Sequence, residues 1–128
     1  MEPSDKLNEL SNRVIGSAIE VHKHLGPGFL ESIYEEALAF ELSRLGIKFQ
    51  RQVEIPVIYK GRNVGSGRLD LLVENELVIE LKSTEKMLPL HQAQIISYLK
   101  TTGLILGLLI NFNTPILKQG IKRIIHSN

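Results

Sequence analysis

The chain has 128 residues, of which 43% are hydrophobic, and its 15 lysines and arginines nearly balance its 14 aspartates and glutamates. This composition predicts a single folded domain over residues 1–128 and excludes a disordered chain; it also lacks the strongly basic footprint that indicates nucleic-acid binding by itself. Disulfides and thiolate metal sites are excluded because there is no cysteine. No secretory signal or membrane-spanning run is visible, so we expect a cytoplasmic protein without a membrane partner.

Two helices are expected first. Ser4 or Asp5 can cap a helix whose apolar residues recur every three or four positions, and Gly26 ends it. Its apolar stripe consists of Leu7, Leu10, Val14, Ala18, Val21 and Leu25. A second helix is predicted over residues 30–45, with a core face made of Leu30, Ile33, Tyr34, Ala37, Leu38, Leu42 and Leu45.

From residue 47 onward the apolar period shifts towards two, which indicates strands. Residues 47–61 read as strand interrupted at Pro56, and a hairpin follows over residues 68–83. The remaining predicted elements are a helix over residues 88–103, a buried strand over 104–112, and a strand or short helix over 117–125. The order αα-ββββ-α-ββ predicts an α/β fold with a mixed sheet flanked by helices.

The predicted hairpin, GRLDLLVENELVIELKS, carries charges inside two apolar runs. A three-residue loop over residues 74–76 gives the strand register that keeps six aliphatic side chains on one face. These are Leu69, Leu71, Val73, Leu77, Ile79 and Leu81. The same register places Asp70 directly opposite Glu80, with Lys82 one pleat farther along the same face.

Two opposed carboxylates destabilise a sheet unless a positive charge lies between them. Lys82 is one such charge, and a divalent cation such as Mg²⁺ or Mn²⁺ is a further partner, because these ions prefer carboxylate and carbonyl oxygens. The alternative is that Glu80 and Lys82 form a solvated ion pair on an open sheet face, with Asp70 simply exposed.

Polar residues on the predicted helices bear on the choice between a metal site and a solvated ion pair. Glu31 falls inside the apolar arc of the second helix, so it is either directed at a site or is an edge residue favoured by the helix start. On the third helix, His91, Gln94 and Tyr98 form a polar stripe that suits an anionic ligand or plain solvent exposure. Arg68 and other basic residues either contact phosphate or are scattered solubility charges.

The combined motifs resemble a known family. Asp70 followed by Glu80-x-Lys82, with QIISY (residues 94–98) on the next helix, resembles the PD-(D/E)XK nuclease superfamily and its RecB-like branch, although Leu69 replaces the leading proline. GFLESIY (residues 28–34) resembles the signature of the small prokaryotic GxxExxY proteins, which are assigned to that superfamily. The resemblance covers roughly residues 7–125 and implies a restriction-endonuclease-like fold.

The resemblance also implies roles for individual residues. Asp70, Glu80 and the backbone carbonyl of Leu81 would bind Mg²⁺ or Mn²⁺, with Glu31 completing or supporting the metal site. Lys82 would orient or activate the attacking water. Substrate contacts would come from Gln94, Tyr98, Tyr34 and Arg68.

The leading hypothesis is therefore a metal-dependent nuclease that acts on DNA, with RNA as the less favoured substrate. Small nucleases of this type often use two subunits, so a homodimer is one expectation. A non-catalytic nucleic-acid- or partner-binding module on the same fold is the first alternative. A small-ligand or transport-associated binding protein is the second, and the missing export signal argues against its periplasmic form.

Overall fold

The computed structural model describes residues 2–127 and contains the predicted elements with one strand fewer. Its helices are α1 (Asp5–Leu25), α2 (Glu31–Arg44), α3 (Pro89–Thr102) and the short 3₁₀ helix η1 (Leu117–Gly120). Its strands are β1 (Phe49–Tyr59), β2 (Arg62–Val73), β3 (Leu77–Lys82), β4 (Leu106–Asn111) and β5 (Ile121–Ile125). No helix in this described range is both long and apolar enough to cross a membrane.

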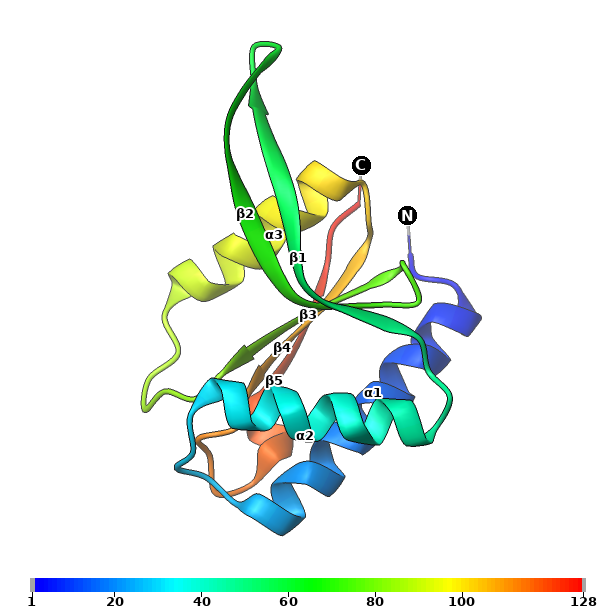
Figure 1. Cartoon of the computed structure of the whole chain (residues 1–128), viewed down its shortest axis with the longest axis vertical. Coiled ribbons are helices and arrows are strands. Elements are labelled where there is room, and N and C mark those ends of the chain that lie inside the picture. The colour runs from blue at the N-terminus through cyan, green and yellow to red at the C-terminus, as the bar shows by residue number, and fades with distance from the viewer. Residues whose placement is uncertain (1, 128) are drawn as a thin grey trace.

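The five strands form one mixed sheet in the order β1-β2-β3-β4-β5. Only β3 and β4 run parallel, and α3 is the connection between them. Helices α1 and α2 cover one face of the sheet, whereas α3 covers the other (Figure 1). The predicted mixed sheet flanked by helices, as in a restriction-endonuclease-like fold, is confirmed.

The prediction of four strands before α3 is wrong, because Pro56 does not interrupt the first of them. β1 runs through this residue, which pairs with Ser66 of β2. β1 lies at the edge of the sheet, where the missing proline N–H removes no bond to a further strand. One long strand, β1, therefore takes the place of two short strands.

Helix α1 follows its prediction closely. The Ser4 hydroxyl accepts a hydrogen bond from the Leu7 N–H at 3.1 Å, and Gly26 at the C-terminus adopts a φ of 68°. In α2 the predicted core face is too wide: Leu30, Ile33 and Leu45 are exposed. The helix buries a narrower seam, spaced four residues apart, that consists of Tyr34, Leu38 and Leu42.

Two hydrophobic cores lie on opposite faces of the sheet. The larger core packs α1 and α2 against the sheet and includes five of the six hairpin aliphatics. Leu69 is the exception, since it packs against Ile95 and Leu99 of α3 in the second core, together with Val78. The prediction that all six share one face is therefore wrong at Leu69.

The change of face occurs at Gln52 and Asp70. These two residues are missing from the run of paired positions that extends from Phe49–Val73 to Val57–Gly65, and Gln52 has a φ of 51°. Leu71 and Leu69, on either side of Asp70, consequently face opposite cores. Beyond this point the β1–β2 hairpin bends over α3 and projects from the body of the protein (Figure 1).

Candidate active site

Asp70 and Glu80 meet where β2 and β3 separate. The predicted register is confirmed from Val73–Leu77 to Leu71–Ile79, and the paired positions end there. Beyond Leu71–Ile79, hydrogen bonds to the two carboxylates connect the strands in place of backbone pairing. The Leu81 N–H donates to Asp70 Oδ2 at 2.8 Å, and the Asp70 N–H donates to Glu80 Oε1 at 3.1 Å. Each carboxylate is thus held by the strand that carries the other.

The predicted three-residue loop, residues 74–76, is also present and accounts for this register. Glu74 and Asn75 adopt left-handed conformations, with φ values of 51° and 58°. Asparagine tolerates this conformation better than most residues. The alignment of the two acids therefore follows from a turn at the far end of the hairpin.

Burial makes it unfavourable for Asp70 and Glu80 to be ionised at the same time. Glu80 is 7% exposed, and desolvation followed by the charge of Asp70 raises its pKa to about 8. The pKa of Asp70 is also raised, chiefly by burial, although the hydrogen bond from the Leu81 N–H opposes this shift. At neutral pH the pair without a cation therefore retains a proton, mainly on Glu80.

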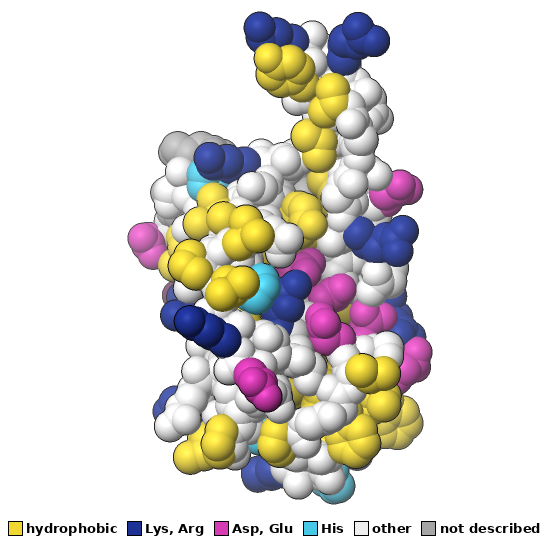
Figure 2. All heavy atoms as spheres, turned by 90° about the vertical axis from the view of Figure 1, so that its left-hand side faces the viewer, with side chains coloured by type: hydrophobic (Ala, Val, Ile, Leu, Met, Phe, Trp, Pro, Cys, Tyr) yellow, Lys and Arg dark blue, Asp and Glu magenta, His cyan; other side chains and the backbone are white. Residues whose placement is uncertain are grey.

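Lys82 lies two residues after Glu80 on β3, so both side chains point to the same face. It is half-buried, and its positive charge lowers the pKa of both acids. Glu80 is buried on that face, which contradicts the alternative of a freely solvated ion pair. Figure 2 shows acidic side chains gathered midway along this side of the molecule, next to basic ones.

The two carboxylates match the donor chemistry of a small divalent cation. The N–H and C=O of a strand residue face the same neighbour, so the carbonyl of Leu81 faces the side from which Asp70 binds its N–H. Two carboxylates, a carbonyl and water are ligands that Mg²⁺ commonly uses. Among residues 2–127, however, no three acidic, histidine or cysteine side chains lie close enough to hold one metal ion.

Glu31 is therefore not brought together with the acid pair as a third metal-binding side chain. It is the first residue of α2 and is exposed. The acid of α2 that does influence Asp70 is Glu35, which lies one helical turn later and is 8% exposed. Its charge contributes to the raised pKa of Asp70.

Glu35 connects α2 to the site through a hydrogen-bond network that the sequence interpretation missed. Arg51 Nε donates to Glu35 Oε2 at 2.9 Å, and Gln52 Nε2 donates to Glu35 Oε1 at 2.6 Å. The same Gln52 amide nitrogen lies 3.5 Å from Asp70 Oδ1. One sequence signal was available: Glu35 shares the buried i, i+3, i+4, i+7 positions of Leu38, Ala39 and Leu42.

The residues predicted on α3 lie across the sheet from α2. Tyr98 is half-buried with its ring against β2, where a Cβ atom at Gly67 would lie 2.5 Å from Tyr98 Cε1. Gln94, one turn before Tyr98, is exposed, as is Arg68 beside Gly67. His91 Nδ1 accepts a hydrogen bond from the Leu88 N–H at 3.1 Å, so it caps the start of the helix.

Tyr34, predicted as a substrate contact, is fully buried instead. Its ring stacks on Phe112 with centroids 4.3 Å apart. Its hydroxyl donates to the Gly26 carbonyl at 2.5 Å and accepts from the Phe29 N–H at 3.2 Å. Because Ser83 Oγ also donates to the Phe29 carbonyl, the loop before α2 is tied to the end of β3. In this position Tyr34 braces the loop.

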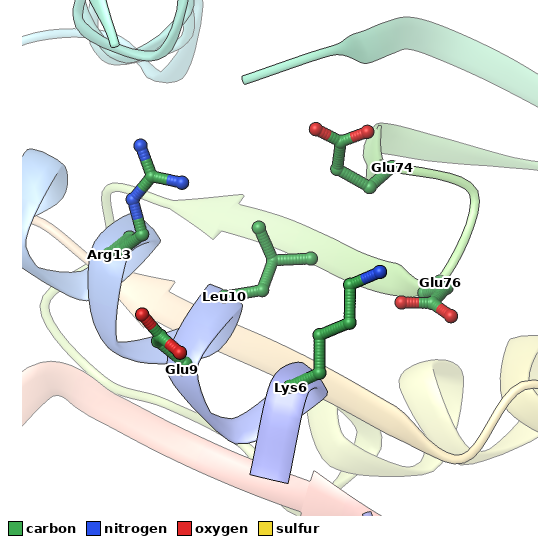
Figure 3. Close-up of a pocket in the computed structure, with 6 residues that line it drawn as sticks. All are labelled: Lys6, Glu9, Leu10, Arg13, Glu74 and Glu76. Carbon is green, nitrogen blue, oxygen red and sulfur yellow. The ribbon is translucent and has the colours of Figure 1, made fainter. Parts of the chain in front are cut away.

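A separate groove lies between α1 and the β2–β3 turn (Figure 3). Its lining mixes both signs of charge and consists of Lys6, Glu9, Leu10, Arg13, Glu74 and Glu76. It is at the turn end of the hairpin, whereas the acid pair is at the end where the strands separate. We assign it no part in the site.

A model of the PD-(D/E)XK nuclease superfamily matches residues 8–124 of this sequence. The chain belongs to this superfamily, whose members are in general nucleases. A comparison with curated proteins gives no match. The RecB-like branch, the GxxExxY group, the choice of metal and the roles of the individual residues remain predictions.

Proposed function

We propose that this protein is a metal-dependent nuclease that hydrolyses phosphodiester bonds of DNA, with RNA as the less favoured substrate. The observation that carries the proposal is the buried Asp70–Glu80 pair with Lys82 on the same sheet face. Superfamily membership supports the same reaction class. Two acids that do not both ionise at neutral pH without a cation, next to a lysine, form a site suited to a metal and an anionic substrate.

The residues that would hold Mg²⁺ or Mn²⁺ are Asp70, Glu80 and the carbonyl of Leu81. A bound divalent ion supplies an activated water and neutralises charge that develops on the phosphate. Glu80 must release its proton before it can serve as a ligand, since its pKa is about 8 without a cation. Metal binding is therefore expected to strengthen as the pH rises towards 8.

The remaining groups position the acids and the substrate. Lys82 offsets negative charge near the acid pair and would orient the attacking water. Gln52 and Glu35 restrict the position of the Asp70 carboxylate through their shared hydrogen bonds. Arg68 and Gln94 are exposed on β2 and α3, where they can contact the phosphodiester backbone.

Nuclease assays with single-stranded, duplex and branched DNA and with RNA test the proposal. We expect cleavage that requires Mg²⁺ or Mn²⁺ and falls at least about 100-fold in Glu80→Gln and Asp70→Asn, since each removes a metal-binding charge. Glu76→Gln, an exposed acid on the same hairpin, is the matched control and should cleave normally.

Calorimetric titration with Mn²⁺ supplies a readout that does not depend on finding the right substrate. Wild type should bind the ion, whereas Glu80→Ala should not. Absence of both cleavage and Mn²⁺ binding would overturn the proposal. Nucleic-acid binding that survives Asp70→Ala with Glu80→Ala, in a protein that cleaves nothing, would favour the non-catalytic binding module.

A further inference from the structure

The outer part of the β1–β2 hairpin is an exposed arm, which faces the rest of the fold only at its start, where Pro56, Val57 and Ile58 line a groove with the end of α3. We define the arm as residues 56–66, all of which are exposed. Ile55, just before it, is the last residue of β1 that is buried against α3. In Figure 1 the arm projects well beyond the rest of the molecule. Eleven consecutive exposed residues give no packing reason for this extension of the sheet.

The arm is nevertheless an ordered ribbon. Paired positions continue to its end at Tyr59–Arg62, with one shift of register between Val57 and Ile58, and the two turn residues, Lys60 and Gly61, have φ values of 49° and 81°. Positive φ at both turn positions is the conformation that matches the natural twist of a two-residue hairpin. At its base Ser66 Oγ donates to Glu54 Oε1 at 2.9 Å. Because the ribbon is already ordered, it loses little conformational entropy when it binds a partner.

The charge of the arm is entirely positive. Lys60 and Arg62 flank its tip, Arg68 follows its base, and no acidic residue occurs between Glu54 and Asp70. This is notable in a chain whose net charge is only +1. The exposed apolar side chains of the arm are Val57, Ile58, Tyr59 and Val64. Figure 2 shows basic side chains at the tip with apolar ones beside and below them.

We propose that the arm grips duplex DNA, with the ribbon in the major groove and Lys60 and Arg62 on the phosphates that border it. The major groove of B-form DNA is about 12 Å wide and admits a two-stranded ribbon. Apolar side chains suit this position because thymine methyl groups line the groove. The proposal rests on the proposed nuclease function and narrows its substrate to duplex DNA.

The arm is also joined directly to the candidate site. Strand β2 carries both Arg62 at the tip and Asp70 at the acid pair. Asp70 lies eight positions after Arg62, which corresponds to about 26 Å at the rise of an extended strand. This distance is roughly seven to eight base pairs at about 3.4 Å each. DNA held by the arm would therefore extend from the site for most of one helical turn.

A second copy of this chain is the competing occupant. In a symmetric dimer built arm to arm, each patch meets itself, so Lys60 and Arg62 would face the same residues of the other copy. The arm carries no acid that could neutralise them. DNA phosphates supply that neutralisation, so the charge favours nucleic acid over self-association.

Fluorescence anisotropy with a labelled 24-base-pair DNA duplex, in EDTA so that no metal-dependent cleavage occurs, tests the arm. We expect Lys60→Glu with Arg62→Glu to weaken binding at least about tenfold and to reduce the slope of log affinity against log salt by about 2. The matched control reverses Lys6 and Lys23, two exposed lysines of α1 away from the arm, and should bind like wild type. An RNA duplex of the same sequence should bind more weakly, because its major groove is too narrow.

The possible outcomes test the arm proposal independently of the nuclease proposal. Equal DNA affinity of the arm variant and the control would overturn the arm proposal, even in a protein that cleaves DNA. Arm-dependent DNA binding in a protein that cleaves nothing would keep the arm and reject the nuclease. A wild-type dimer that dissociates in the arm variant, measured by sedimentation, would overturn the DNA assignment in favour of a second copy.

Discussion

The Asp70 N–H donates a hydrogen bond to Glu80 Oε1, and the Leu81 N–H next to Glu80 donates to Asp70 Oδ2. The two carboxylates thereby replace the backbone bonds that β2 and β3 stop making at Leu71–Ile79. These two hydrogen bonds hold the carboxylates in place, although their negative charges repel each other. This balance makes the acid pair sensitive to pH.

Without a divalent cation, the protein should become less stable as the pH rises. The pKa of Glu80 is about 8 in the fold against 4.5 as an ordinary side chain, so the folded state binds more protons between these values. Stability from this group is therefore complete below about pH 4.5 and is lost as the pH rises through 8. The raised pKa of Asp70 acts in the same direction. We expect a loss of a few kcal/mol at most.

Urea unfolding in EDTA between pH 5 and pH 8.5 measures this effect. Glu80→Gln should flatten the pH dependence because it removes the titrating group, whereas Glu76→Gln should retain it. Added Mg²⁺ or Mn²⁺ should restore stability at pH 8 in wild type and in Glu76→Gln. A stability that rises from pH 5 to pH 8.5 in wild type without a cation would contradict the assignment.

The buried pair could be predicted from the sequence because its signals are local. Alternation of aliphatic residues on both sides of a three-residue loop determines the register, and Asn75 favours the turn. Pro56 misled the strand assignment because nothing local indicates that β1 is an edge strand. That position depends on the order of the whole sheet.

Other parts of the site depend on contacts distant in sequence. Leu69 changes face because Gln52, on a different strand, takes a left-handed conformation. Glu35 becomes part of the site because Arg51 and Gln52 reach across to it from β1. The helical pattern alone does not tell which of Glu31 and Glu35 lies near the acid pair, since the two are one turn apart on the same side of the helix.

Removing Glu35 should destabilise the fold. Glu35→Ala leaves the Arg51 guanidinium without its buried carboxylate partner and the Gln52 amide without its shorter hydrogen bond, so we expect a loss of about 1–3 kcal/mol in the free energy of unfolding. Arg44→Ala breaks the exposed pair with Glu41 and should cost about 0.5 kcal/mol or less. Chemical denaturation compares the two. Equal losses would show that the Glu35 network does not stabilise the site.

Gly67 should be intolerant of a side chain because Tyr98 packs against it. Gly67→Ala would place its methyl group 2.5 Å from Tyr98 Cε1, and overpacking of this kind costs about 1–3 kcal/mol. The same change at Gly16, an exposed helix position with nothing within 4 Å, should instead stabilise by about 0.5–1 kcal/mol.

A double-mutant cycle assigns the cost at Gly67. Tyr98→Ala should reduce the penalty of Gly67→Ala, because the ring that meets the new methyl group is gone. Thermal unfolding of the four proteins gives the interaction energy. An unchanged penalty in the Tyr98→Ala background would show that the strain arises in the backbone of β2 rather than at the ring.

Tyr34 should contribute to stability and not to substrate binding. Tyr34→Phe keeps the stacking on Phe112 but removes the hydroxyl that joins Gly26 to Phe29, so we expect a loss of about 1–2 kcal/mol in the free energy of unfolding. DNA affinity, and KM where cleavage is found, should remain within about twofold of wild type, because the ring is fully buried. Tyr98→Phe, a half-buried tyrosine on α3, is the matched comparison. A Tyr34→Phe protein of normal stability but much weaker DNA binding would place the hydroxyl in contact with the substrate after all.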